Sequence, residues 1–291
     1  MRLILAEGRT PASDEKVIDF LRMAIERKID LTRMCVAEAN GQLLWAILPV
    51  YSPGRTALLL APREAPDGHR ESAARELIAY TLKKLASTGV QLGQVLLDPA
   101  DRTARRLFVA SGFEQLAELV YLQRLVRSTW EYPALANGRL WLHYNQSTHA
   151  VFGQTILQSY IHSLDCPALN GKRHIDDILA GHLAAGEHDP SLWFALVEND
   201  APLGVLILSH AVQTDSMELV YLGVPHLARG QGIGNLLMQQ ALATVADRNV
   251  SRLTLAVDSR NTPGLQLYHR HGMHRVANRF ALLRDVTRLT R

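Results

Sequence analysis

The sequence predicts an α/β (α+β) protein made of two copies of one unit, each a mixed, mostly antiparallel central sheet with helices on both faces. Three observations support this prediction. Segments of the two halves match at one constant offset, strand-like and helix-like runs alternate in the C-terminal half, and a glycine-rich turn joins one such strand to a helix. With 291 residues, 47% of them hydrophobic, the chain can bury two cores.

The repeat is found by aligning the chain with itself. The offset that places Gly112 on Gly272 also places residues 95–98 on residues 255–258 without a gap. Further leucines of a helix-like run match at the same offset. Because one offset covers a strand, a helix and a glycine junction, we infer a duplicated unit.

This duplication sets the expected domains. The first copy covers residues 1–126 and the second residues 139–291. Residues 127–138 are predicted to be a linker, because they contain Pro133 and the turn-forming pair Asn137-Gly138.

The second copy is predicted to contain a strand, two helices, three strands, a helix, a strand, a helix and one or two closing strands. The expected ranges are 140–144, 148–163, 174–187, 192–198, 202–210, 217–224, 235–248, 253–257, 262–271 and 273–283. Ligands of such sheets bind where neighbouring strands diverge at their carboxyl ends. The glycine-rich turn follows one such end.

That turn, Arg229 to Gly234, is the most informative segment. Its glycines, Gly230, Gly232 and Gly234, have no Cβ to keep a ligand away from the backbone. The first turn of the following helix offers N–H groups and a positive dipole end, which suit a phosphate, and Arg229 adds a positive charge at the rim. We interpret the segment as a pyrophosphate-binding loop.

Two other phosphate-binding motifs do not match. A Walker loop needs Gly-Lys-Ser/Thr at the start of the helix, but Gly234 is followed by Asn235-Leu236. A dinucleotide fingerprint needs Gly-x-Gly-x-x-Gly, whereas the spacing here is Gly-x-Gly-x-Gly.

Composition limits the other functions. Lys+Arg of 31 against Asp+Glu of 28 gives a net charge of +3, too mild to predict nucleic-acid binding. Cys35 and Cys166 fit no metal or redox spacing and are expected to be free thiols. We find no signal peptide and no stretch long enough to span a membrane, so we expect a cytoplasmic protein without membrane or nucleic-acid partners.

Two motifs of the second copy resemble a known family. Arg229-x-x-Gly232-x-Gly234, after a strand that ends in Leu222-Gly223-Val224, resembles the acyl-CoA signature of the GCN5-related N-acetyltransferases (GNAT). Residues 258–273 resemble a later segment, in which an Asn opens a helix and a Tyr lies one turn before its closing Gly. The tandem layout is similar to that of members that pair a degenerate N-terminal copy with an active C-terminal one.

The resemblance implies acetyl-CoA as co-substrate and a role for each matching residue. Leu222, Gly223 and Val224 would lie beside the pantetheine arm, Asn261 would hydrogen-bond the cofactor near that arm, and Tyr268 would donate a proton to the departing sulfur. The pyrophosphate would be held by the loop residues Arg229, Gly230, Gln231, Gly232, Ile233, Gly234 and Asn235.

Glu218 is the candidate base, acting through water. Period-two alternation places it on one face with Val220, Leu222 and Val224, and a carboxylate among apolar neighbours has a raised pKa. The alternative is a strand glutamate with its head in water. Tyr268 could instead be a core residue, and Asn261 could be a helix N-cap, either alone or while it also binds the ligand.

Other conspicuous residues have ordinary explanations. Gly272 interrupts the helical spacing of His269, His271 and His274, so no metal site is predicted. Arg260 and Arg270 are candidates for the 3′-phosphate of coenzyme A, but exposed arginines are ordinary on protein surfaces. The acceptor pocket could be lined by Trp141, His143, Tyr144, His162 and Trp193, with core packing expected for both tryptophans.

The first copy is expected to be inactive. At the same offset, Glu218 and Tyr268 are replaced by Leu58 and Phe108, and Asn261 by Asp101. In the loop, Gln231, Gly232 and Gly234 become Glu71, Ser72 and Ala74, which adds a negative charge and bulk where phosphates would bind.

The sequence therefore predicts an acetyl-CoA-dependent N-acetyltransferase, with direct attack by a primary amine of a small molecule. A protein lysine or N-terminal amine is the alternative acceptor, and a non-catalytic acyl-CoA sensor is the alternative of another class. The identity of the acceptor, the acyl chain length and the oligomeric state stay open.

Overall fold

The computed structural model describes residues 1–6, 10–126, 129–186, 189–211 and 215–290. They form two compact units: unit 1 comprises Met1–Ala117 and Arg279–Arg291, and unit 2 comprises Glu118–Asn278. This division differs from the boundary expected within residues 127–138. Of that predicted linker, Arg127 and Ser128 lie outside the described residues, and residues 129–138 contain neither helix nor strand and belong to unit 2.

The sheet of unit 2 has the strand order β5-β10-β9-β8-β7-β6. Only β10 and β9 pair in parallel, and the other neighbours are antiparallel, so the predicted mixed, mostly antiparallel sheet is confirmed. The strands are β5 (Glu114–Leu125, of which 118–125 belong to unit 2), β6 (Arg139–His143), β7 (Trp193–Glu198), β8 (Ala201–Ala211), β9 (Ser216–Gly223) and β10 (Arg252–Asp258).

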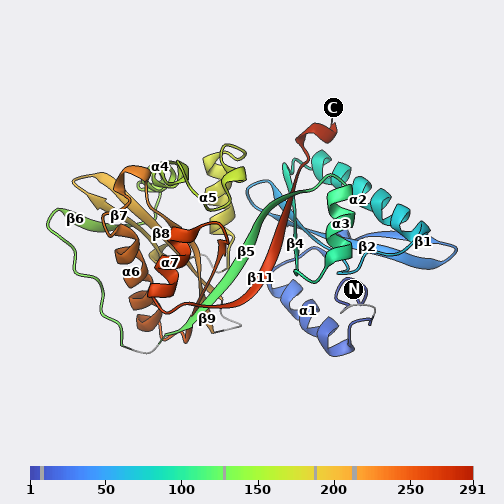
Figure 1. Cartoon of the computed structure of the whole chain (residues 1–291), viewed down its shortest axis with the longest axis horizontal. Coiled ribbons are helices and arrows are strands. Elements are labelled where there is room, and N and C mark those ends of the chain that lie inside the picture. The colour runs from blue at the N-terminus through green and yellow to red at the C-terminus, as the bar shows by residue number, and fades with distance from the viewer. Residues whose placement is uncertain (7–9, 127–128, 187–188, 212–214, 291) are drawn as a thin grey trace. The chain divides into compact units, whose positions relative to one another are not determined.

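Helices cover both faces of this sheet (Figure 1). A Cβ at Gly204 would lie 3.0 Å from Ile233 of α6, whereas a Cβ at Gly223 would lie 2.7 Å from Ser159 of α4. Because Gly223 pairs with Val205, the residue after Gly204, these two positions point to opposite faces. Helices α4 (His149–Tyr160) and α5 (Ile175–Leu183) contact each other, as do α6 (Ile233–Asp247) and α7 (Thr262–Arg270).

Local sequence explains where α6 and α7 begin. Gly232, with φ of 78°, precedes α6, and the buried side chains Leu237, Ala241 and Leu242 fix that helix on the core. Asn261 caps α7, since its Oδ1 accepts the Gly264 N–H at 3.1 Å.

Strands β9 and β10 diverge at their carboxyl ends. They pair only over residues 216–218 and 252–254. Beyond that point β9 remains paired with β8 and β10 with β5. The pairing of β9 with β8 also shifts register and leaves Val220 without a partner residue. The carboxyl end of this sheet is therefore open between two neighbouring strands, as the sequence predicts.

Unit 1 has the strand order β1-β2-β3-β4-β11, in which β4 pairs with residues 280–285 of β11. Unit 1 has two hydrophobic cores, one on each face of its sheet, and alternate residues of β2 belong to different cores. Trp45 and Ile47 pack with helices α2 and α3, whereas Ala46 and Leu48 pack with α1. The elements are α1 (Asp14–Glu26), β1 (Cys35–Ala39), β2 (Gln42–Ser52), β3 (Thr56–Leu60), α2 (His69–Ser87), β4 (Leu92–Leu97), α3 (Arg102–Ala110) and β11 (His274–Asp285).

The internal repeat is visible in the elements. Helices α3 and α7, at 102–110 and 262–270, begin and end at matching positions of the two copies, and so do strands β5 and β11, at 114–125 and 274–285. The copies also exchange their closing strands. Residues 118–125 of the first copy complete the sheet of unit 2, and residues 279–285 of the second complete that of unit 1.

Several expected boundaries differ from the structure. The helix predicted over 148–163 ends at Tyr160, and the one predicted over 174–187 ends at Leu183, with Glu187 outside the described residues. The second copy ends in one closing strand, β11. Within the described ranges, no helix is both long and apolar enough to cross a bilayer.

Candidate functional site

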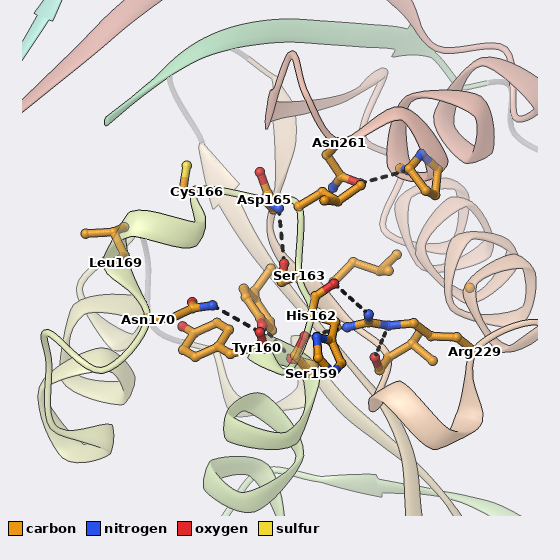
Figure 2. A pocket seen from close by; sticks show the side chains of 18 of the residues that line it. Ser159, Tyr160, His162, Ser163, Asp165, Cys166, Leu169, Asn170, Arg229 and Asn261 are labelled. Carbon is orange, nitrogen blue, oxygen red and sulfur yellow. Dashed lines mark hydrogen bonds between the residues drawn. The ribbon is translucent and has the colours of Figure 1, made fainter. Parts of the chain in front are cut away.

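A cavity of about 470 Å³ lies where β9 and β10 diverge. Its wall comes from segments far apart in the sequence. These are the end of α4 and the loop after it, helix α5, residues 220–224 at the end of β9, Arg229, the start of α6 and helix α7. Figure 2 shows the loop residues Asp165 and Cys166 close to Asn261 of α7. The cavity thus joins the glycine loop to the face covered by α4 and α5.

The glycine loop has the geometry of an anion site. Gly230 and Gly232 have φ of 77° and 78°, a conformation in which a side chain is strained, and a Cβ on either would meet no atom within 4 Å. In this described segment, the N–H groups of residues 230–234 donate to no main-chain acceptor, whereas that of Asn235 donates to Gly232 O at 3.0 Å. The loop therefore presents amides that an anion could satisfy.

Arg229 has a different place from the rim charge that the sequence suggests. Its guanidinium donates to three carbonyl oxygens, those of Val224 at 3.2 Å, His162 at 3.0 Å and Ser159 at 2.7 Å. Figure 2 shows it directed toward the end of α4. Arg229 thus ties the start of the glycine loop to the opposite wall of the cavity.

Gly223 is required by a close approach. A Cβ there would lie 2.7 Å from Ser159 Oγ and 2.7 Å from the Tyr221 ring. Ser159 donates to Ile156 O at 2.7 Å, so its Oγ accepts the Tyr221 hydroxyl proton, also at 2.7 Å. The end of β9 therefore packs against α4 through the glycine backbone.

Asn261 and Tyr268 of α7 both line the cavity. Asn261 is the helix N-cap and also lines the cavity, so the cap and ligand roles are compatible. Tyr268 is 6% exposed, and burial, together with the negative charge of Asp165, raises its pKa far above the usual value. A tyrosine in such a place stays protonated and can act as a donor.

Glu218 lies outside the wall. It is exposed and is the last residue of β9 that pairs with β10, opposite Thr254. The register shift at Val220 interrupts the alternation that groups Glu218 with Val220, Leu222 and Val224. The burial expected for Glu218 is therefore wrong, and the alternative of a strand glutamate with an exposed head describes its position.

The end of the cavity near α5 is polar and buried. Burial raises the pKa of Tyr160 to about 12, raises that of Tyr221 well above its ordinary value, and lowers that of His182 to about 4, with Arg173 contributing to the last shift. Burial also lowers the pKa of Arg173. His182 packs against the Tyr221 ring, with 5.3 Å between ring centroids. Near neutral pH this end therefore holds neutral hydroxyl and imidazole groups beside one guanidinium.

A second group surrounds the end of β10. Asp258 is fully buried, and its carboxylate binds Arg260 at 2.6 Å and the Cys166 N–H at 3.2 Å. Burial would raise the pKa of Asp258, but the hydrogen bonds and charge of Arg260 lower it. Burial raises the pKa of Cys166 to about 12, so its thiol is protonated. Arg260, a phosphate candidate in the sequence, is thus paired within the protein.

Most of the remaining candidate residues from the sequence lie outside the cavity wall. His162 lines the cavity, but Trp141, His143, Tyr144 and Trp193 are not among its lining residues. His269, His271 and His274 contact Met273 O, Asn235 Oδ1 and Gln123 Nε2 respectively. In the part of the chain that is described, no cluster of three or more His, Cys, Asp or Glu side chains could hold a metal ion.

Sequence reasoning missed much of the wall opposite the glycine loop. Tyr160, Asp165, Arg173 and His182 line the cavity, yet they carry no motif and come well before the glycine loop in the chain. The only signal for them is indirect. A buried sheet face at β9 requires a covering helix, and polar residues at the end of that helix then face the opening.

Comparison with known proteins gives consistent results. The model described as "Acetyltransferase (GNAT) family" matches residues 159–273. A mycothiol acetyltransferase from Jonesia denitrificans is 39% identical over 70 residues, which cover 24% of this chain and 22% of that protein. The match therefore spans about a fifth of that relative. The duplication in the sequence is what suggests a tandem layout similar to that of mycothiol synthase.

Solved structures resemble the whole chain in fold. A GCN5-related N-acetyltransferase from Sphaerobacter thermophilus has a TM-score of 0.65 at 19% identity, covering 98% of this chain and 91% of the other. A tandem GNAT protein from the clavulanic acid biosynthesis pathway has a TM-score of 0.56 at 14% identity, covering 98% and 92%. At these identities the likeness concerns the fold, including its tandem form.

Proposed function

Because residues 159–273 belong to the acetyltransferase (GNAT) family, we propose that the protein transfers an acetyl group from acetyl-CoA to a primary amine of a small molecule. The observation that carries the proposal is the row of main-chain N–H groups at residues 230–234, which have no main-chain acceptor and lead into the cavity lined by Asn261 and Tyr268. A pyrophosphate satisfies such a row, and the helix dipole of α6 favours its charge.

The rest of the cofactor follows the cavity wall. The pantetheine arm would lie along Leu222, Gly223 and Val224, where β9 has no neighbour on its β10 side. The Asn261 amide would hydrogen-bond that arm. A main-chain N–H at this edge would polarise the thioester carbonyl, and a donor aimed at developing negative charge lowers the barrier.

Tyr268 would protonate the departing thiolate. It is buried, lines the cavity and remains protonated at neutral pH because burial raises its pKa. Its hydroxyl can therefore donate in the step that releases coenzyme A. Glu218 as base stays a prediction that requires a water chain, because its side chain is exposed and lies outside the cavity wall.

A small acceptor is favoured over a protein chain by the buried end of the cavity. Tyr160, Tyr221 and His182 are held there by burial and mutual packing. A compact polar amine fits such a place better than an extended peptide.

The test is release of free thiol from acetyl-CoA in the presence of a panel of small amines, with a lysine-containing peptide in a parallel arm. We expect release only with small amines, and mass spectrometry should find acetylated product. If the protein binds coenzyme A but no arm releases thiol, the protein is an acyl-CoA sensor and not an enzyme. If only the peptide arm releases thiol, the acceptor is a protein amine and not a small molecule.

A further inference from the structure

Asp165 occupies a special position in the cavity wall. It lies in the loop after α4, and among the described lining residues it is the only one with a carboxylate. Its Oδ1 accepts the main-chain N–H of Asp258 at 2.9 Å, which fixes the side chain at the end of β10. Its own N–H donates to Ser163 Oγ at 3.1 Å. In Figure 2, Asp165 lies on the side of the cavity where Asn261 begins α7.

No cation of the described chain is paired with this carboxylate. Two guanidinium groups of the surrounding segments have other partners: Arg260 binds Asp258 at 2.6 Å, and Arg229 binds three main-chain carbonyls. Arg173 donates to Asp177 O at 2.7 Å. A partly buried carboxylate without a counter-ion is costly, and a cationic ligand would relieve that cost.

The surroundings of Asp165 also favour proton uptake. Burial raises its pKa, the Asp258 N–H opposes this, and the Asp258 charge adds to it. The ionisable groups that face it are Tyr160 of α4, Tyr221 of β9, Tyr268 of α7, Asp258 of β10 and neighbouring Cys166. The tyrosines and the thiol are neutral near pH 7, so Asp165 and Asp258 carry the negative charge.

We propose that Asp165 binds the acceptor as its ammonium ion and accepts the proton that the nitrogen must lose before or during attack on the thioester. This inference rests on the proposed function. An N–H bond of the acceptor breaks and an O–H bond forms on Asp165, while the nitrogen lone pair forms the new N–C bond. The C–S bond then breaks and the sulfur takes the Tyr268 proton. The nitrogen loses its second proton, which restores the Tyr268 hydroxyl, and the Asp165 proton leaves to solvent, so that one proton is released per acetylated ammonium ion.

Asp165 and Glu218 make different predictions, because one lies in the wall and the other is exposed outside it. The experiment compares Asp165→Asn, Glu218→Gln and the wild type with an amine that the wild type acetylates. Asp176→Asn is the matched control, since it removes the same charge from a 67% exposed side chain on α5. Measured are kcat, KM for the amine, and the affinity for coenzyme A by calorimetry.

We expect Asp165→Asn to lose kcat/KM by about 10²-fold or more, which is typical of removing a general base, and to raise KM for the amine. Its coenzyme A affinity should stay within twofold. Asp165→Glu should retain part of the activity, because it keeps a carboxylate. The wild-type kcat/KM should fall at acid pH, where Asp165 is protonated, and this limb should vanish in Asp165→Asn.

The following outcomes decide whether Asp165 has this role. An Asp165→Asn enzyme within threefold of wild type, or a larger loss in Glu218→Gln, overturns the assignment of Asp165 and leaves the acetyltransferase proposal intact. Equal losses of turnover and coenzyme A affinity mean that Asp165 only supports the loop, which also overturns it. If Asp165→Asn does not fold, the activity of Asp165→Glu decides: equal inactivity in a folded Asp165→Glu contradicts the assignment. A wild type without acetyl transfer defeats the proposed function itself.

Discussion

Units 1 and 2 share one framework and differ at the few positions that could do chemistry. In both, a parallel strand pair diverges after a short paired stretch, at 56–58 with 92–94 and at 216–218 with 252–254. Where unit 2 has Tyr268 in a cavity wall, unit 1 has fully buried Phe108, which packs on Trp45 and Phe113 with centroids 6.1 and 5.2 Å away. The same backbone thus serves as a site in one copy and as a core in the other.

The first turns of α2 and α6 differ in the same way. Ala74 is fully buried where unit 2 has Gly234, and Glu71 at the first turn of α2 pairs with Arg75 at 2.8 Å. In the described residues, unit 1 has one α-helix, α1, before β1, whereas unit 2 has two, α4 and α5, between β6 and β7. Unit 1 therefore has no described counterpart of the wall that holds Asp165.

The largest expected effect tests whether unit 1 needs the closing strand that the second copy supplies. A chain that ends at Asn278 loses residues 280–285, which pair with β4, together with Leu282 and Val286, both fully buried. We expect unit 1 to lose most of its free energy of unfolding, about 5–15 kcal/mol for a domain. Limited proteolysis and thermal unfolding measure this, with a chain that ends at Leu289 as control. An intact unit 1 in the shorter chain would contradict the exchange of closing strands.

The next effect tests the difference between Tyr268 and Phe108. Tyr268→Phe gives unit 2 the side chain of unit 1 and removes only the hydroxyl that would protonate the thiolate. We expect kcat to fall roughly 10²- to 10³-fold, with unchanged affinity for coenzyme A in calorimetry. A variant with wild-type turnover would mean that Tyr268 is a core residue like Phe108.

The third effect concerns pH. His182 is neutral and buried, with a pKa lowered to about 4 from the ordinary 6.5, whereas the matching residue of unit 1 is exposed Arg22. Between these values the unfolded chain binds more protons, so stability falls as the pH drops below 6.5. We expect unit 2 to lose up to about 2 kcal/mol at pH 5. Urea unfolding should show a weaker pH dependence in His182→Met, but the full dependence in His274→Gln.

A smaller effect is expected from the loop glycines. Gly232→Val forces a branched side chain into a φ of 78° and so distorts the row of amides at residues 230–234. We expect at least about a tenfold loss of coenzyme A affinity, because hydrogen bonds to a charged group contribute about 1.5–3 kcal/mol each. Calorimetry measures it, and Gly171→Val, a glycine with φ of 75° outside this loop, is the control. Equal affinity in Gly232→Val would remove the loop from the site.

The smallest effect is an expected absence of change. Giving unit 1 the loop residues of unit 2, by Glu71→Gln, Ser72→Gly and Ala74→Gly, should leave coenzyme A uptake at one molecule per chain. The reason is that unit 1 would still have the buried Phe108 in place of Tyr268. It would also still have no described counterpart of the cavity wall that holds Asp165. A second molecule bound in calorimetry would show that the loop alone makes the site.

The sequence predicts the parts of the fold that are determined by short stretches of chain. The local patterns of the second copy correctly place α7 and β11, and the glycine pattern starts the preceding helix at residue 235, close to Ile233 where α6 begins. Asn261 at the head of α7 is also confirmed. These features depend on periodicity, glycine conformation and capping, which act over short stretches of chain.

Features that depend on distant partners could not be predicted. The alternation around Glu218 fails because β9 shifts register against β8, which is decided by two strands together. Arg229 finds carbonyl partners as far away as Ser159, and Asp165 acquires its position through the Asp258 N–H. The exchange of closing strands could not be predicted either, because the residue pattern of β5 and β11 would be the same whichever sheet each strand joined.

That exchange has a consequence for synthesis on the ribosome. Unit 1 is translated first, but the strand that closes its sheet, residues 279–285, comes after all of unit 2. Strand β4 must therefore wait with one edge unpaired until residues 98–278 have been made, and bare strand edges favour aggregation. A chaperone that covers this edge would prevent aggregation during that interval, and the sheet of unit 1 is completed only when residues 279–285 emerge.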